Sequence, residues 1–138
     1  MTTRVDLIIR QGETWSLSYA KKDSAGAAVD LTGYTARLAI RDRVGGTLQA
    51  YLSTGADADG GTITLGGAAG TVALAMTATQ SADLASSTVE LEAALFGYGV
   101  KNVGPVTTYV YDLELVSGAG AVTRELEGRV EVQRQVTT

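Results

Sequence analysis

Hydrophobic and polar residues alternate along most of this chain. The alternation is clearest in five runs, at residues 5–10, 14–19, 35–41, 109–115 and 122–132. Because successive side chains of a strand point to opposite faces of a sheet, each run predicts a strand with one buried face and one face in water. Such one-sided strands are typical of antiparallel sheets.

Turn segments separate these runs, and most of them contain glycine, which supplies the positive φ angles that tight turns need. They lie at residues 11–12, 23–26, 45–46, 59–61, 66–70 and 117–120. The last of them predicts a hairpin between the two final long strands. About eight strands at this spacing predict an all-β fold, an antiparallel β-sandwich of immunoglobulin-like or jelly-roll-like form. We expect residues 1–138 to form one such domain.

One short helix is expected within this pattern, from Thr77 to Ala85. Thr77 can cap it, and Gln80 follows three residues later, which is the spacing of a capping box. We expect this helix to cover one open end of the sandwich. The irregular segment at about 86–107 contains Pro105, which disfavours a central strand, so a protruding loop or hairpin is expected there.

Composition excludes several kinds of active site. The chain has no cysteine and no histidine, so thiolate, zinc–thiolate and Ser-His-Asp chemistry are impossible within it. With 11 basic and 15 acidic residues the net charge is −4, whereas nucleic-acid binding usually needs a basic surface. No apolar run reaches the roughly 18 residues of a membrane span. We expect no enzyme, no cofactor, no nucleic acid and no membrane insertion.

Three ligand-site patterns are present only in part. Residues 57–60 resemble a fragment of a calcium loop, but Gly55 and Gly66 stand where acidic ligands are needed, so an Asp-Gly turn without metal is expected. The glycines of residues 66–70 lack the Lys-Ser or Lys-Thr of a phosphate loop. Acidic pairs at 90/92, 112/114 and 125/127 could flank a glycosidic bond. However, the pair at 125/127 shares a strand face with Arg129 and Glu131, which predicts a charged stripe in water rather than a catalytic site.

The aromatic residues fall into two groups. One group occupies alternating strand positions, where core packing is expected rather than a platform that stacks on sugars; it comprises Trp15, Tyr19, Tyr109 and Tyr111. The other group, Phe96 and Tyr98, lies in a loop flanked by glycine. Exposed aromatic residues are enriched where protein chains meet, so we expect this loop to contact another chain.

The order of these signals resembles a known group of proteins. The residues that carry the resemblance are 5–12 followed by Trp15, then 29–37 with 40–41, and finally 111–115, 124–132 and 136–137. In this order they resemble small virion proteins of bacteriophages and prophages. They are similar to the amino-terminal domain of the upper baseplate proteins of lactococcal-type tailed phages. The resemblance implies a β-sandwich assembly module, arranged symmetrically in the virion and without catalytic residues.

We therefore expect a non-enzymatic structural protein of the tail, baseplate or head–tail region, made in the bacterial cytoplasm and located in the virion. It should contact neighbouring virion subunits and form a homo-oligomer within a symmetric assembly. One expected contact is the segment with Phe96, Tyr98 and Val100. The other is a basic cluster of Arg41 and Arg43, joined by Arg4, that faces acidic neighbours.

Two alternatives stay open at this point. Family members often continue beyond the position of Thr138, and the segment at residues 86–107 is longer than the resemblance implies, so a free-standing capsid decoration, neck or tail-tip subunit is also possible. The other alternative is a carbohydrate-binding module for attachment to the host surface. It would require Tyr51, Tyr98 or Tyr109 to cluster on an exposed flat face.

Overall fold

The computed structural model describes residues 3–55, 59–84 and 106–133. Within them lie nine strands, one α-helix and one short 3₁₀ turn at Gly67–Ala69. The strands and the helix are β1 (Thr3–Arg4), β2 (Leu7–Arg10), β3 (Trp15–Ala20), β4 (Thr35–Arg41), β5 (Leu48–Ser53), β6 (Gly61–Leu65), β7 (Thr71–Met76), α1 (Ala78–Asp83), β8 (Val106–Val116) and β9 (Val122–Gln133).

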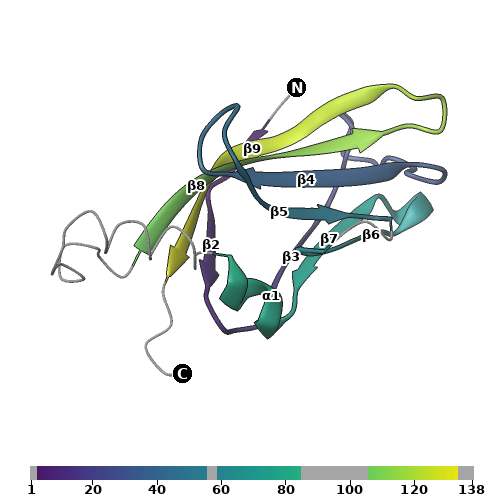
Figure 1. Cartoon of the computed structure of the whole chain (residues 1–138). Coiled ribbons are helices and arrows are strands. Elements are labelled where there is room, and N and C mark those ends of the chain that lie inside the picture. The colour runs from purple at the N-terminus through teal and green to yellow at the C-terminus, as the bar shows by residue number, and fades with distance from the viewer. Residues whose placement is uncertain (1–2, 56–58, 85–105, 134–138) are drawn as a thin grey trace, which may run out of the picture.

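The strands are joined in one hydrogen-bonded sheet with the order β1-β9-β8-β4-β5-β6-β7-β3, and β2 also pairs with β9. The sheet curls, so its two ends approach one another around a common interior (Figure 1). The prediction of a β-rich fold is confirmed. A division into two stacked sheets, which the predicted sandwich requires, is not confirmed by this single continuous path.

The prediction of a purely antiparallel sheet is wrong. Strands β1 and β2 run parallel to β9, and β5 runs parallel to β6. The alternation of apolar and polar residues specifies which face of a strand is buried, but it carries no information on the direction of the neighbouring strand. The short turn after β2 leads to β3 at the opposite end of the sheet, so β2 pairs with the last strand instead of forming a hairpin.

The core lies inside the curl. Side chains from strands far apart in the sequence meet there with almost no exposed surface, among them Ile9, Leu38, Leu52, Leu113 and Val130. These are the apolar positions of the alternating runs, so the predicted buried faces are confirmed. Burial of such side chains is the main favourable contribution to folding.

A polar turn starts the central strand β4. The Asp30 carboxylate accepts hydrogen bonds from the Thr32 backbone N–H (2.9 Å) and the Thr32 hydroxyl (2.6 Å). These bonds stabilise the charged form and lower the pKa of Asp30. Gly33 follows with a φ of 82°, and Leu31 is buried beneath the turn. The side chain of Asp30 thus directs the chain into the sheet.

Helix α1 forms as the sequence predicts. Thr77 accepts a hydrogen bond from the Gln80 N–H, and the Gln80 side chain accepts one from the Thr77 N–H, which completes the capping box. Buried Ser81 accepts a hydrogen bond from the Gly12 N–H (3.0 Å) and donates one to the Glu13 carbonyl (2.8 Å). The helix therefore fixes the connection between β2 and β3 at one end of the curl (Figure 1). The expected last residue, Ala85, and the predicted protrusion up to residue 105 lie outside the described residues.

A β-bulge in β9 overturns one expectation about charge. Leu113 of β8 faces Leu126, but the next residue, Glu114, faces Arg124, so Glu125 is an extra residue in β9. Glu125 is consequently buried and is not part of a solvated stripe. Its two carboxylate oxygens accept hydrogen bonds from the Lys21 ammonium at 2.8 and 2.7 Å. Because Lys21 directly follows β3, this ion pair connects the two ends of the sheet.

We predict that Lys21→Met lowers the free energy of unfolding by about 2–4 kcal/mol, because it leaves the buried Glu125 carboxylate without its cation. The double variant Lys21→Met, Glu125→Leu should recover most of this loss, since no charge is then buried alone. Urea denaturation measures both variants. Equal losses in the single and the double variant would contradict the assigned role of the ion pair.

Gly128 allows β9 to approach the start of the chain. A Cβ at this position would collide with the Val5 carbonyl oxygen, which also accepts a hydrogen bond from the Tyr111 hydroxyl. We predict that Gly128→Ala destabilises the fold by about 1–3 kcal/mol, because backbone must move to make room. Gly118→Ala is the matched control, since its Cβ would have its nearest contact, with the Gly33 carbonyl, at 3.5 Å. Equal urea midpoints for the two variants would count against a close approach at Gly128.

Candidate functional site

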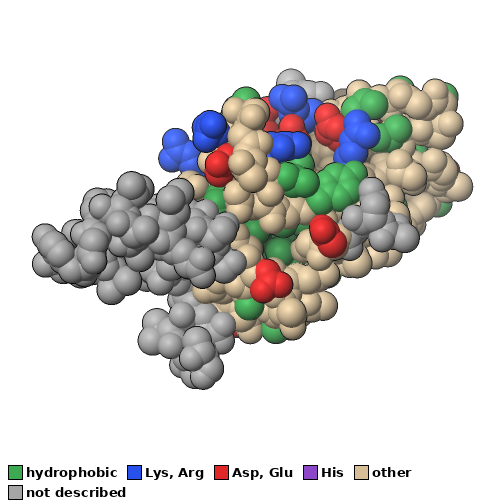
Figure 2. Space-filling view, in the orientation of Figure 1, with side chains coloured by type: hydrophobic (Ala, Val, Ile, Leu, Met, Phe, Trp, Pro, Cys, Tyr) green, Lys and Arg blue, Asp and Glu red, His purple; other side chains and the backbone are tan. Residues whose placement is uncertain are grey.

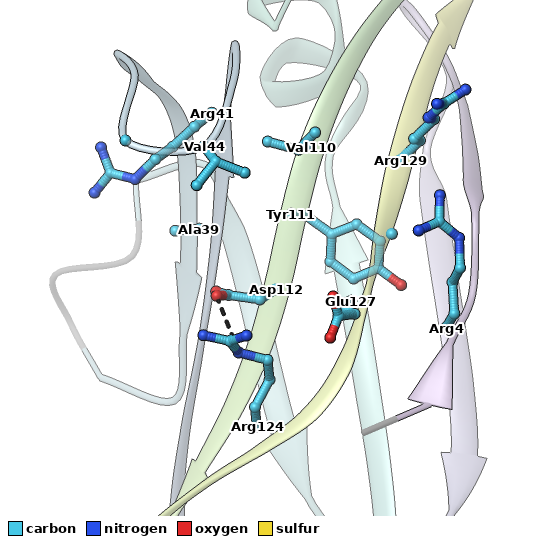
Figure 3. A pocket seen from close by; sticks show the side chains of 12 residues that line it. Arg4, Ala39, Arg41, Val44, Val110, Tyr111, Asp112, Arg124, Glu127 and Arg129 are labelled. Atoms are coloured by element: carbon cyan, nitrogen blue, oxygen red, sulfur yellow. Dashed lines mark ion pairs between the residues drawn. The ribbon is translucent and has the colours of Figure 1, made fainter. Parts of the chain in front are cut away.

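The outer face of β4, β8 and β9 contains a hollow of about 390 Å³, which we call the arginine hollow. Figure 2 shows basic and acidic side chains interleaved over the part of the molecule where these strands lie. Four arginines line the hollow, namely Arg4, Arg41, Arg124 and Arg129. Figure 3 shows Arg4 and Arg129 on the side of β9 that faces β1, and Arg41 with Val44 on the side of β4.

The strand register explains why these residues meet. Across β4, β8 and β9, Arg41 stands beside Val110, which stands beside Arg129. In the next row on this face, Ala39 stands beside Asp112, and Asp112 beside Glu127. Ala39 and Val110 are short side chains between longer charged ones, so the surface is hollowed there. Strand β1 adds Arg4, because it runs parallel to β9 with Arg4 opposite Glu127.

The bulge brings Arg124 to the same face. In a regular strand, residues 124 and 127 would point to opposite faces of the sheet. The extra residue at Glu125 changes this alternation, so Arg124 and Glu127 both line the hollow while Glu125 turns inward. The same backbone irregularity therefore shapes the interior and the outer surface.

The hollow carries excess positive charge with unused hydrogen-bond donors. Its four arginines and two carboxylates, Asp112 and Glu127, leave a net charge of +2 on a chain whose total is −4. Arg124 lies 3.5 Å from Asp112, and Arg41 donates a hydrogen bond to the Gly46 carbonyl. Among the described residues, the side chains of Arg129 and Glu127 form no ion pair or hydrogen bond.

Tyr111 forms part of the inner wall of the hollow. Its hydroxyl donates a hydrogen bond to the Val5 carbonyl at 2.5 Å. Burial disfavours the phenolate and raises the pKa of Tyr111 to about 12, with a smaller contribution from the charge of Asp6. The pKa of Tyr19 is also raised, by burial and then by the charges of Glu125 and Tyr111. Both hydroxyls are therefore neutral near pH 7.

The predicted contact residues have different outcomes. Arg41 and Arg4 line the same hollow, and their role in a contact stays a prediction. Arg43 does not line it, because β4 ends at Arg41 and the chain turns; the Arg43 guanidinium lies 3.6 Å from Asp42 instead. The other expected contact, Phe96, Tyr98 and Val100, lies outside the described residues and stays a prediction.

The aromatic residues on the strands belong to the core, as predicted. Tyr109 is 1% exposed and its hydroxyl donates a hydrogen bond to the Leu84 carbonyl. Tyr111 is also buried, whereas Trp15 and Tyr19 are partly buried against the same core. These four residues therefore do not form an exposed platform.

The chemistry of the hollow suits an anionic group. Guanidinium groups bind carboxylates with charge-assisted hydrogen bonds, often two at once. The net positive charge opposes binding of a metal cation, and the described residues contain no group of three or more acidic side chains that could ligate one. The walls also contain the apolar side chains of Val44 and Val110, so a protein segment with both acidic and apolar residues fits best.

Comparison with known proteins assigns this chain to no family. No protein-family model matches this chain, and no curated protein sequence matches it. Across residues 3–55, 59–84 and 106–133, no helix has the length and apolar character needed to cross a membrane.

We predict that stability falls as the pH rises from 10 to 12, because the Tyr111 pKa is higher in the folded chain than in the unfolded one. Over this range the unfolded chain has lost the phenolic proton and the folded chain retains it, so unfolding becomes easier. Urea midpoints measured at pH 9, 10, 11 and 12 test this. In Tyr111→Phe the fall should be smaller, and an unchanged fall would contradict the assignment to Tyr111.

Proposed function

We propose that this chain is a non-enzymatic structural protein of a bacteriophage virion, an assembly module of the tail, baseplate or head–tail region. Its outer sheet face binds neighbouring subunits. The observation that carries the proposal is the combination of the arginine hollow with Val44, which is 90% exposed at the β4–β5 hairpin. In this proposal the curled sheet corresponds to the β-sandwich of the proteins that the sequence resembles, because its inward-facing side chains share one core.

The composition of this face supports a contact with protein. Arginine is enriched at protein–protein interfaces. Covering an exposed apolar side chain with a partner removes apolar surface from water, which contributes favourably to the free energy of binding. Leu48, on the same hairpin as Val44, is 45% exposed. A single surface ion pair contributes only about 0–1 kcal/mol. In a symmetric particle, however, many copies bind together, and high effective concentration makes weak contacts sufficient.

The alternatives differ in their support. A capsid decoration protein would use the same face. A carbohydrate-binding module has less support, because Tyr109 is buried in the core. Tyr51 is half-buried beside Arg37 and Thr54 at a smaller hollow of about 210 Å³, and Tyr98 lies outside the described residues.

The proposal predicts that purified particles, produced from a phage genome that encodes this chain, contain it at a fixed number of copies. Val44→Asp should lower that number at least tenfold, because it places a carboxylate where apolar contact is needed. Quantitative mass spectrometry of particles measures the copy number. Absence of the unmodified chain from particles would overturn the proposal.

Val122→Asp is the matched control. Val122 is 51% exposed at the start of β9, and it is not part of the arginine hollow. It should therefore leave the copy number unchanged. If both variants reduced incorporation equally, the effect would not be specific to the hollow. That result would contradict the role proposed for this face.

A further inference from the structure

We infer that the free edge of β3 pairs with β3 of a second copy, in an antiparallel arrangement about a twofold axis. This contact lies on a different element from the arginine hollow and does not depend on the proposed function. It extends the curled sheet of one copy into that of the other. Both the backbone and the side chains of β3 favour this contact.

Strand β3 is the last strand of the sheet and pairs only with β7 in the described part of the chain. The Lys21 N–H donates to the Gly70 carbonyl, so the odd-numbered residues of β3 direct their backbone groups toward β7. The even-numbered residues therefore direct theirs away from the sheet. Among the described residues, the N–H and C=O groups of Ser16, Ser18 and Ala20 along this edge have no hydrogen-bond partner.

The edge lacks the features that normally prevent strand addition. Natural proteins protect edge strands with charged side chains, proline, bulges or very short length. Strand β3 has six residues, and the exposed side chains along it are Ser16, Ser18 and Ala20, with Thr14 just before. All four are small and uncharged. By contrast, β2, at the other end of the sheet, has four residues and carries exposed Arg10.

The opposite face of β3 is incompletely covered. Trp15, Leu17 and Tyr19 point toward the core, yet each remains partly exposed, whereas their neighbours on β7 are buried. An added strand would cover these side chains as well as satisfy the free backbone groups. The edge therefore has the two features that β-strand addition uses, namely backbone groups for hydrogen bonding and apolar side chains that a partner can cover.

The side chains of β3 favour a second copy in one register. When Leu17 faces its counterpart, Ser16 faces Ser18 and Trp15 faces Tyr19, so aromatic pairs form across the new contact. A shift of one copy by two residues instead brings Trp15 opposite Lys21 and Leu17 opposite Tyr19, so no aromatic pair forms.

Sedimentation of the full chain across a concentration series tests the inference. The unmodified chain should show a monomer–dimer equilibrium, and Ser18→Lys should weaken dimerisation at least tenfold, because it adds two cations to the shared edge. Thr62→Lys is the control, since Thr62 is exposed on β6, between β5 and β7, and not at an edge. A chain that stays monomeric at every concentration overturns the inference, as does a dimer that Ser18→Lys leaves unchanged.

A cross-linking experiment tests the register independently of any effect on folding. The chain has no cysteine, so introduced thiols are unique. Chains with Ser16→Cys mixed with chains with Ser18→Cys should form mixed disulfides, because directly opposite residues lie about 5.5 Å apart between Cα atoms, within disulfide reach. Each variant alone should cross-link at least fivefold less. Equal cross-linking in the mixture and in the separate variants would overturn the proposed register.

Discussion

The extra residue at Glu125 is the constraint on which both the interior and the outer face depend. It turns the Glu125 carboxylate inward to meet the Lys21 ammonium, and this joins the two ends of the curled sheet. It also places Arg124 on the outer face beside Asp112. A regular β9 could not do both, because its residues would alternate strictly between the two faces. The bulge therefore couples closure of the fold to the charge pattern outside it.

Much of the fold could be predicted from local sequence patterns. The strands, the helix cap at Thr77 and the turn at Asp30 depend on residues close together in the chain, and all three formed as expected. The hairpin between β8 and β9 was also predictable from its glycine-rich turn. These features need only propensity, alternation and side-chain-to-backbone hydrogen bonds.

The rest depends on interactions between distant residues, and local patterns do not contain them. The parallel pairing of β1 with β9 brings Arg4 to the arginine hollow, although nothing near Arg4 indicates a partner more than a hundred residues away. Alternation alone does not indicate the extra residue in β9, so it predicts Glu125 in water and does not bring Arg124 to the basic cluster. The spacing of two residues predicts that Arg43 lies beside Arg41, but β4 ends at Arg41.

The pairing of β1 and β2 with β9 also constrains how the chain folds during synthesis. Leu7 stands opposite Val130, so β2 has no neighbouring strand until residue 130 has left the ribosome. Contacts that are so distant in sequence close large loops and slow folding. Until then, the apolar side chains of Leu7 and Ile9 are exposed to other nascent chains. Rapid synthesis of many copies would thus make chaperone binding to this amino-terminal segment an advantage.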